Sequence, residues 1–145
     1  MKRACVAIFS LLLAACAHDK GDPELIKPAV EKFHQRARWK DFRGAAELIV
    51  EERQATFIKE RLKHDDDRDL FITNFDLEDA KVAPDMMSAT VVSKISWYRM
   101  PSNVEKTAVV TSVFVWRNEA WILESQDDGP FEDLKPAPKK KKDAE

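Results

Sequence analysis

The chain is poor in cysteine, and this shortage narrows what it can be. Only two cysteines, Cys5 and Cys16, occur in its 145 residues. Cys5 lies in an apolar N-terminal run that we expect to be removed, so the mature protein would keep one cysteine. A single cysteine forms no internal disulfide and no cysteine-based zinc site, and we expect neither.

Glycine is also scarce, and there is no excess of positive over negative charge. The three glycines, Gly21, Gly44 and Gly129, are too far apart to form a glycine-rich phosphate loop. The sequence shows no Ser-His-Asp set and no reactive internal thiol, so it predicts no catalytic residues and no cofactor. The net charge is −2, and loss of Lys2 and Arg3 with the leader makes it −4. A chain without a strong positive field is not expected to bind nucleic acid.

The N-terminus has the pattern of an export signal. Lys2 and Arg3 precede an apolar run from Ala4 to Ala15. A run of about 12 residues is too short to cross a bilayer, which takes about 20, but it suits a signal peptide. The run ends in Leu13-Ala14-Ala15-Cys16. Small residues at positions 14 and 15 fit a peptidase cleft, and the thiol that follows is a nucleophile.

This ending resembles the lipobox of bacterial lipoproteins. The resemblance implies cleavage between Ala15 and Cys16, and a diacylglyceryl group on Cys16, usually with a further N-acyl chain. Two or more acyl chains are enough for stable anchoring. By the family's sorting rule, Ala17 in place of Asp implies an outer-membrane, periplasm-facing location. The alternative is a plain secretory signal with an incidental Cys16, which Ala14-x-Cys16 fits less well than Ala-x-Ala would.

Helical patterns fill the first half of the mature chain. Residues 16–23 are expected to form a polar tether, in which Asp22 caps a helix and Pro23 takes its first position. Apolar residues at steps of three and four predict this helix from Glu24 to about Lys40. The expected inward residues are Leu25, Ile26, Ala29, Val30, Phe33 and Ala37. Asp41 is expected to start a second, shorter helix. A third helix from about Glu51 to Lys63 carries Ala55, Phe57, Ile58 and Leu62.

Strand patterns fill the second half. The expected strands are 71–82, 88–98, 106–116 and 120–125, and the third is apolar on both sides, as in a central strand. Gly129-Pro130 is expected to end the folded region, so we predict one domain over 24–133 and a disordered lysine-rich tail over 134–145. Helices first and a meander afterwards predict an α+β fold, with N-terminal helices packed on one face of a curved antiparallel sheet.

One stretch of this domain resembles a known superfamily. Phe33-His-Gln-Arg-Ala37-Arg-Trp39-Lys-Asp41-Phe42-Arg-Gly-Ala45-Ala46-Glu-Leu48, followed by long strands, is similar to the nuclear transport factor-like superfamily, which includes ketosteroid isomerase. The resemblance covers roughly 24–127 and implies a cone-shaped fold with a pocket between helices and sheet. An unrelated helix-then-meander fold, such as a cystatin-like one, is the alternative.

That superfamily contains both enzymes and binding proteins, so the fold alone implies no activity. No residue here matches the pocket acids of its enzymes. Asp76 and Asp79 are expected to be solvated charges at a strand edge.

Three tryptophans on consecutive strands are the candidate pocket residues. Trp97, Trp116 and Trp121 would stack on a ligand ring if they line a pocket, but such residues are more often plain core. Alternation places Trp97 and Tyr98 on opposite faces of the sheet.

Three polar groups receive simpler interpretations. His64-Asp-Asp-Asp-Arg-Asp69 lacks the alternating acids and the glycine of a calcium loop, so we expect a helix end, a solvated loop and no metal. His18 and His34 have no ligand spacing. Lys139 to Lys142 would contact anionic head groups or peptidoglycan if they are a surface signal, but a solubilising tail is the simpler reading.

Together these patterns predict a lipid-anchored, non-enzymatic domain facing the periplasm. Its expected partners are the membrane, through Cys16, and a small apolar ligand or an envelope protein. One alternative is a small enzyme of ketosteroid-isomerase type, which needs an ionisable group inside the cone. The other is a structural accessory of an envelope assembly, which predicts a filled core and an exposed apolar patch.

Overall fold

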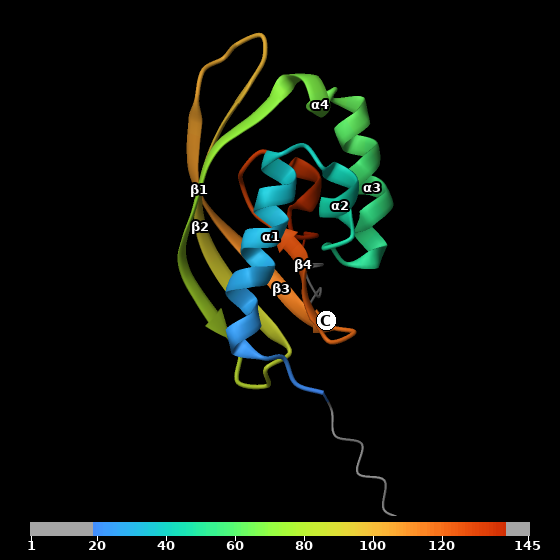
Figure 1. Ribbon diagram of the computed structural model, residues 1–145, viewed down its shortest axis with the longest axis vertical. Coiled ribbons are helices and arrows are strands. Elements are labelled where there is room, and N and C mark those ends of the chain that lie inside the picture. The colour runs from blue at the N-terminus through green and yellow to red at the C-terminus, as the bar shows by residue number, and fades with distance from the viewer. Residues whose placement is uncertain (1–18, 139–145) are drawn as a thin grey trace, which may run out of the picture.

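The computed structural model describes residues 19–138, in which short helices precede an antiparallel sheet (Figure 1). The helices are η1 Pro23–Leu25, α1 Ile26–Arg38, α2 Phe42–Ala46, α3 Glu51–Lys63 and α4 Asp66–Asp69. The strands are β1 Leu70–Val82, β2 Ser88–Arg99, β3 Lys106–Arg117 and β4 Ala120–Gln126, and η2 Glu132–Leu134 follows them. This arrangement confirms the predicted α+β class, with a curved sheet that does not close into a barrel. Cys16, Ala15 and Lys139 to Lys142 lie outside the described residues.

Two predicted helix starts are present with their caps. The Asp22 carboxylate accepts a hydrogen bond from the Glu24 amide at 2.9 Å, and the Asp41 carboxylate accepts one from the Gly44 amide at 3.0 Å. Each cap satisfies an amide that the helix itself leaves unpaired. The first helix begins as a short 3-10 turn, η1, before it becomes α1.

The four strands pair in sequence order, β1-β2-β3-β4, and every pair is antiparallel. β3 therefore lies inside the sheet, as its apolar pattern predicted. Alternation along β2 is also as predicted: Ala89, Val91 and Ile95 are buried beneath the helices, whereas Thr90 and Lys94 are exposed on the outer face.

The two edge strands differ in how they end the sheet. β1 carries Asp76 and Asp79 as exposed edge charges, which confirms their prediction. β4 is covered by the chain that leads into α3: the Val50 amide donates to Leu123 O at 2.9 Å, and the Leu123 amide donates to Leu48 O at 2.8 Å. Exposed charge on one edge and backbone pairing on the other both discourage strand addition.

Aromatic rings fill the space between helices and sheet. Phe33 of α1, Phe57 of α3 and Phe131 are each at most 1% exposed. The Phe131 centroid lies 5.3 Å from that of Phe57 and 6.3 Å from that of Phe33, in edge-on contacts of the favourable kind. These rings occupy the space between helices and sheet in which the sequence resemblance implied a pocket.

Two of the packed side chains, Phe131 and Leu134, come after the Gly129-Pro130 turn, and Leu134 also lies beyond the predicted domain boundary. Phe131 comes two residues after Gly129, and Leu134 is fully buried. The packed structure thus continues one residue past the predicted boundary at 133.

Three positions expected to face inward are exposed instead: Leu25 at the start of the first helix (46%), and Ala55 and Leu62 of α3. Leu62, part of the apolar pattern, is 68% exposed, whereas its neighbour Arg61 is only 5% exposed. Arg61 lies one turn after the buried Phe57, so it shares the inward face of the helix. A charged side chain in that place needs partners, and these define the first candidate site.

Candidate functional site

The first feature is a group of four charges, which we call the ion cluster: Arg61, Asp66, Arg99 and Asp133. The side chains of Arg61, Asp66 and Asp133 are at most 9% exposed, whereas that of Arg99 is 39% exposed. Arg61 Nε lies 2.8 Å from Asp66 Oδ2, and a second guanidinium nitrogen of Arg61 donates to Asp133. Arg99 donates to the other oxygen of Asp66. Two positive and two negative charges thus neutralise one another across four segments of the chain.

Aromatic rings complete the surroundings of Arg61. Its guanidinium carbon lies 4.6 Å from the Phe57 ring centroid and 4.5 Å from the Phe131 centroid, within the range of cation–π attraction. Burial raises the pKa of Asp133, and the charge of Arg61 opposes that effect. Because the charges pair with one another, the ion cluster is suited to holding α3, α4, β2 and the C-terminal segment together.

This cluster corrects one expectation from the sequence. The run from His64 to Asp69 was predicted to be a solvated loop, but Asp66 is 0% exposed and begins the short helix α4. Within residues 19–138, no group of three or more His, Cys, Asp or Glu side chains is placed to hold a metal ion.

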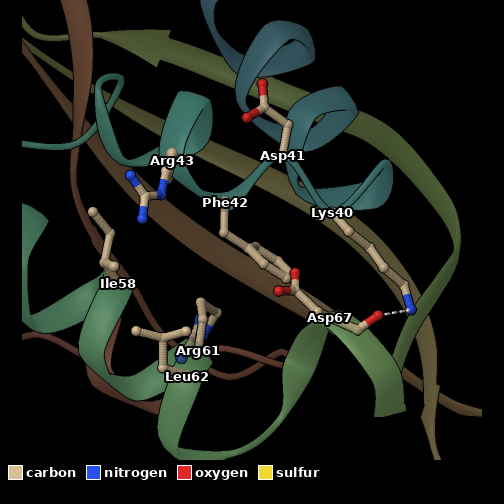
Figure 2. A pocket seen from close by; sticks show the side chains of 8 residues that line it. All are labelled: Lys40, Asp41, Phe42, Arg43, Ile58, Arg61, Leu62 and Asp67. Carbon is tan, nitrogen blue, oxygen red and sulfur yellow. Dashed lines mark hydrogen bonds between the residues drawn. The ribbon is translucent and has the colours of Figure 1, made fainter.

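The second feature is a surface hollow of about 220 Å³, which we call the α2–α3 hollow (Figure 2). Figure 2 shows Arg43 and Ile58 on one side of it and Lys40 and Asp67 on the other, with the Phe42 ring between them. Its full lining is Lys40, Asp41, Phe42, Arg43, Ile58, Arg61, Leu62 and Asp67.

Charges around the hollow are unevenly matched. The Asp41 carboxylate pairs with Arg36 at 2.7 Å, and Lys40 Nζ donates to the Asp67 carbonyl at 2.6 Å. Lys40 Nζ also lies 3.7 Å from the Phe71 ring centroid. Arg43 is exposed and has no ion pair among the described residues. The hollow therefore has a mixed polar and apolar lining, in which the Arg43 guanidinium and the Asp67 carboxylate both lack an ion pair among the described residues.

Size limits what the hollow can hold. Pockets for whole small molecules measure about 300–1,000 Å³. At about 220 Å³ the hollow is smaller than that range. A hollow of this volume has room for one or two side chains of another protein.

The structure brings two of the three candidate tryptophans together. Trp116 and Trp121 form an edge-on pair with centroids 5.4 Å apart, and they are 8% and 3% exposed. Trp121 Nε1 donates to the Asp22 carbonyl at 2.8 Å. Trp97 is half-buried near the C-terminal end of β2, where its neighbours on β1 and β3 are Ile72 and Lys106. Tyr98 stacks on Phe71, so it faces away from Trp97, as alternation predicted.

His34 is the remaining histidine of note among the described residues. Its ring is 2% exposed and stacks on Phe75, with centroids 3.9 Å apart and planes 14° apart. Neither ring nitrogen has a hydrogen-bond partner in the described part of the chain. Burial lowers the pKa of His34 from 6.5 to about 3, so the ring is neutral at ordinary pH.

Sequence reasoning missed both the ion cluster and the α2–α3 hollow. The members of the ion cluster lie far apart in the chain and form no motif. One signal did exist: Arg61 lies four residues after Phe57, on the apolar side of the helix. The hollow depends on how α2 meets α3, which residue spacing does not specify.

Comparison with known proteins supports the fold alone. No protein-family model matches the chain, and no curated protein matches it. Its fold is similar to the solution structure of a SEC-C motif containing protein from Rhodopseudomonas palustris, with a TM-score of 0.56 and 13% identity. The match covers 70% of this chain and 77% of the other. At this identity the likeness concerns the fold alone.

Proposed function

We propose that this protein is a lipid-anchored, non-enzymatic binding module of the bacterial cell envelope. Lipid on Cys16 holds it on the outer membrane, facing the periplasm, and its fold is a filled version of the nuclear transport factor-like cone. Its partner is another envelope protein, which inserts an apolar and an acidic side chain into the α2–α3 hollow. The single observation that carries the proposal is the filled cone.

The filled cone supports surface recognition over binding inside the fold. Phe131 and its neighbours occupy the place where a small apolar ligand or an isomerase substrate would lie. An enzyme of ketosteroid-isomerase type needs an ionisable group that faces such a cavity. Here Asp66 and Asp133 pair with arginines, and His34 stacks on Phe75.

Lipid anchoring is supported by Leu13-Ala14-Ala15-Cys16 and by the apolar run before it. Among residues 19–138, no helix is both long enough and apolar enough to cross a membrane. Replacement of the nucleophile in Cys16→Ser should abolish acylation and leave the protein unanchored or uncleaved. Mass spectrometry of the membrane fraction measures this, and lipid still present on the variant would contradict the anchor.

Partner binding is tested by photocrosslinking in cells. A photoreactive amino acid at Leu62, which is 68% exposed beside the hollow, should give one discrete protein adduct. Arg43→Glu should abolish that adduct, because it reverses the charge that meets the partner's acid. The same amino acid at Val109, 56% exposed on the outer face of the sheet, is the matched control and should not give it. An adduct that survives Arg43→Glu, or forms equally at both positions, would contradict the hollow as the binding site.

A further inference from the structure

The chain leaves the fold at one end of the sheet, and the β1–β2 turn (residues 83–87) lies at that same end (Figure 1). The Gly21 amide donates to the Met86 carbonyl at 2.8 Å. Trp121 holds the next residue through its hydrogen bond to the Asp22 carbonyl. Gly21 itself is buried. The chain is therefore fixed to the domain from Gly21 onward.

That tether is short. Five peptide steps separate Cys16 from Gly21, and a fully extended chain covers about 3.3–3.6 Å per residue, or roughly 17 Å in all. Because Gly21 is bonded to Met86, the β1–β2 turn lies no more than about that distance from a lipidated Cys16. A domain of this size thus has little freedom to turn its other faces toward the bilayer.

Apolar side chains are exposed at the end of the domain that the short tether keeps near the bilayer. Leu25 is 46% exposed, Met86 39% and Met87 36%. We call these three residues the tether face. The turn that carries the methionines is well held: Asp85 accepts from the Met87 amide at 3.0 Å, and the Met87 carbonyl accepts from the Trp116 amide at 2.9 Å. Methionine side chains are flexible and polarisable, and they adapt to irregular apolar surfaces.

We propose that the domain stands end-on on the bilayer, with the tether face, Leu25, Met86 and Met87, in contact with the lipid surface. This inference rests on the proposed anchor at Cys16. The β2–β3 loop, with Met100, lies at the opposite end of the sheet, next to α4 (Figure 1). The α2–α3 hollow, which borders α4 through Asp67, is then turned away from the membrane and toward its partner.

The methionines themselves provide the measurement. Of the four in the chain, Met1 belongs to the leader, so the mature protein keeps Met86, Met87 and Met100. Met86 and Met87 lie on the tether face, whereas Met100, 43% exposed, is a matched control at the far end. With ¹³C-methyl methionine, one NMR spectrum of the native sequence reports on both ends.

The experiment couples the Cys16 thiol of the purified mature chain to a maleimide lipid in nanodiscs. The nanodiscs contain phosphatidylethanolamine, phosphatidylglycerol and a gadolinium-chelate lipid. The Met86 and Met87 methyl signals should relax several-fold faster than that of Met100. High salt should leave the difference in place, because the contact is apolar. In the double variant Met86→Ser, Met87→Ser, the Met100 signal should relax faster than in the native chain, because the preferred orientation is lost.

Equal relaxation at Met86 and Met100, or no change at Met100 in the double variant, would overturn the end-on orientation. Failure of the proposed lipid anchor would give a different result: mass spectrometry of the exported protein would find no lipid on Cys16. Because the nanodisc anchor is attached chemically, the orientation is measured whichever way that result falls.

Discussion

Arg61 and Asp66 form an ion pair that solvent barely reaches, with Nε 2.8 Å from Oδ2 and side chains 5% and 0% exposed. Neither charge is stable alone in such a place, because removal of an ion from water costs several kcal/mol unless a partner compensates it. The pair therefore ties the end of α3 to the start of α4, and Arg99 and Asp133 extend that tie to β2 and the C-terminal segment.

Arg61→Met should destabilise the fold by about 3–5 kcal/mol, because it leaves Asp66 and Asp133 buried without their shared partner. Urea unfolding followed by circular dichroism measures the loss. Arg68→Met is the matched control, since Arg68 is 73% exposed and pairs only with surface acids; its unfolding curve should overlay that of the native chain. Equal curves for the two variants would show that the ion cluster contributes nothing particular to stability.

Phe131→Ala should cost about 3–5 kcal/mol, because it removes a ring packed between Phe33 and Phe57 and leaves a void. The same variant should bind small apolar molecules in that void, a property that the native chain should lack. Thermal unfolding with and without benzene measures both effects. Val104→Ala, at a position 64% exposed, is the control and should change neither. Benzene stabilisation of the native chain would show that the space between helices and sheet is not filled.

The free energy of unfolding should decrease with falling pH between the unfolded-state and folded-state pKa values of His34. The unfolded imidazole takes its proton near 6.5, whereas burial lowers the folded-state pKa to about 3. Between these values the unfolded state binds more protons, so the free energy of unfolding is highest above pH 6.5 and decreases toward pH 3. The slope from this one group is up to about 1.4 kcal/mol per pH unit.

The variant His34→Leu separates this contribution from that of the carboxylates. It should flatten the stability profile between pH 6.5 and 5, where few acids titrate. His64→Leu changes a side chain that is 50% exposed and should leave the slope in place. Unfolding by urea at a series of pH values measures all three chains, and a native slope unchanged in His34→Leu would refute the assignment.

Local patterns predicted the elements well because each depends on neighbouring residues. Asp22 and Asp41 act on amides two and three residues away, and the alternation of β2 follows from the pleat. The packing of Phe131 between the helices and the sheet was not predictable in the same way. Phe131 contacts Phe57 only because the sheet directs the C-terminal segment back toward α3. The sequence Gly129-Pro130 alone indicates a turn at the end of the folded region. Arg61 was missed for a related reason, since its partners come from α4 and from residue 133.

Gly21→Ala tests how firmly the tether is docked. A Cβ at this position would overlap the Trp121 ring and approach the Met86 carbonyl to 2.7 Å, so either the tether or the β1–β2 turn must shift. We expect a loss of about 1–3 kcal/mol, as for other overpacked sites, and faster hydrogen exchange at the amide of position 21. Lys20→Ala alters an exposed neighbour and should change neither quantity.

Gly21→Ala also tests the end-on orientation, because a tether released from the domain would be longer than the segment before residue 21. Chemically anchored to nanodiscs, Gly21→Ala should therefore show a smaller difference in relaxation between Met86 and Met100 than the native chain. A variant as stable as the native chain, with its amide still protected, would mean that the close approach of Gly21 to Trp121 is not what holds the tether.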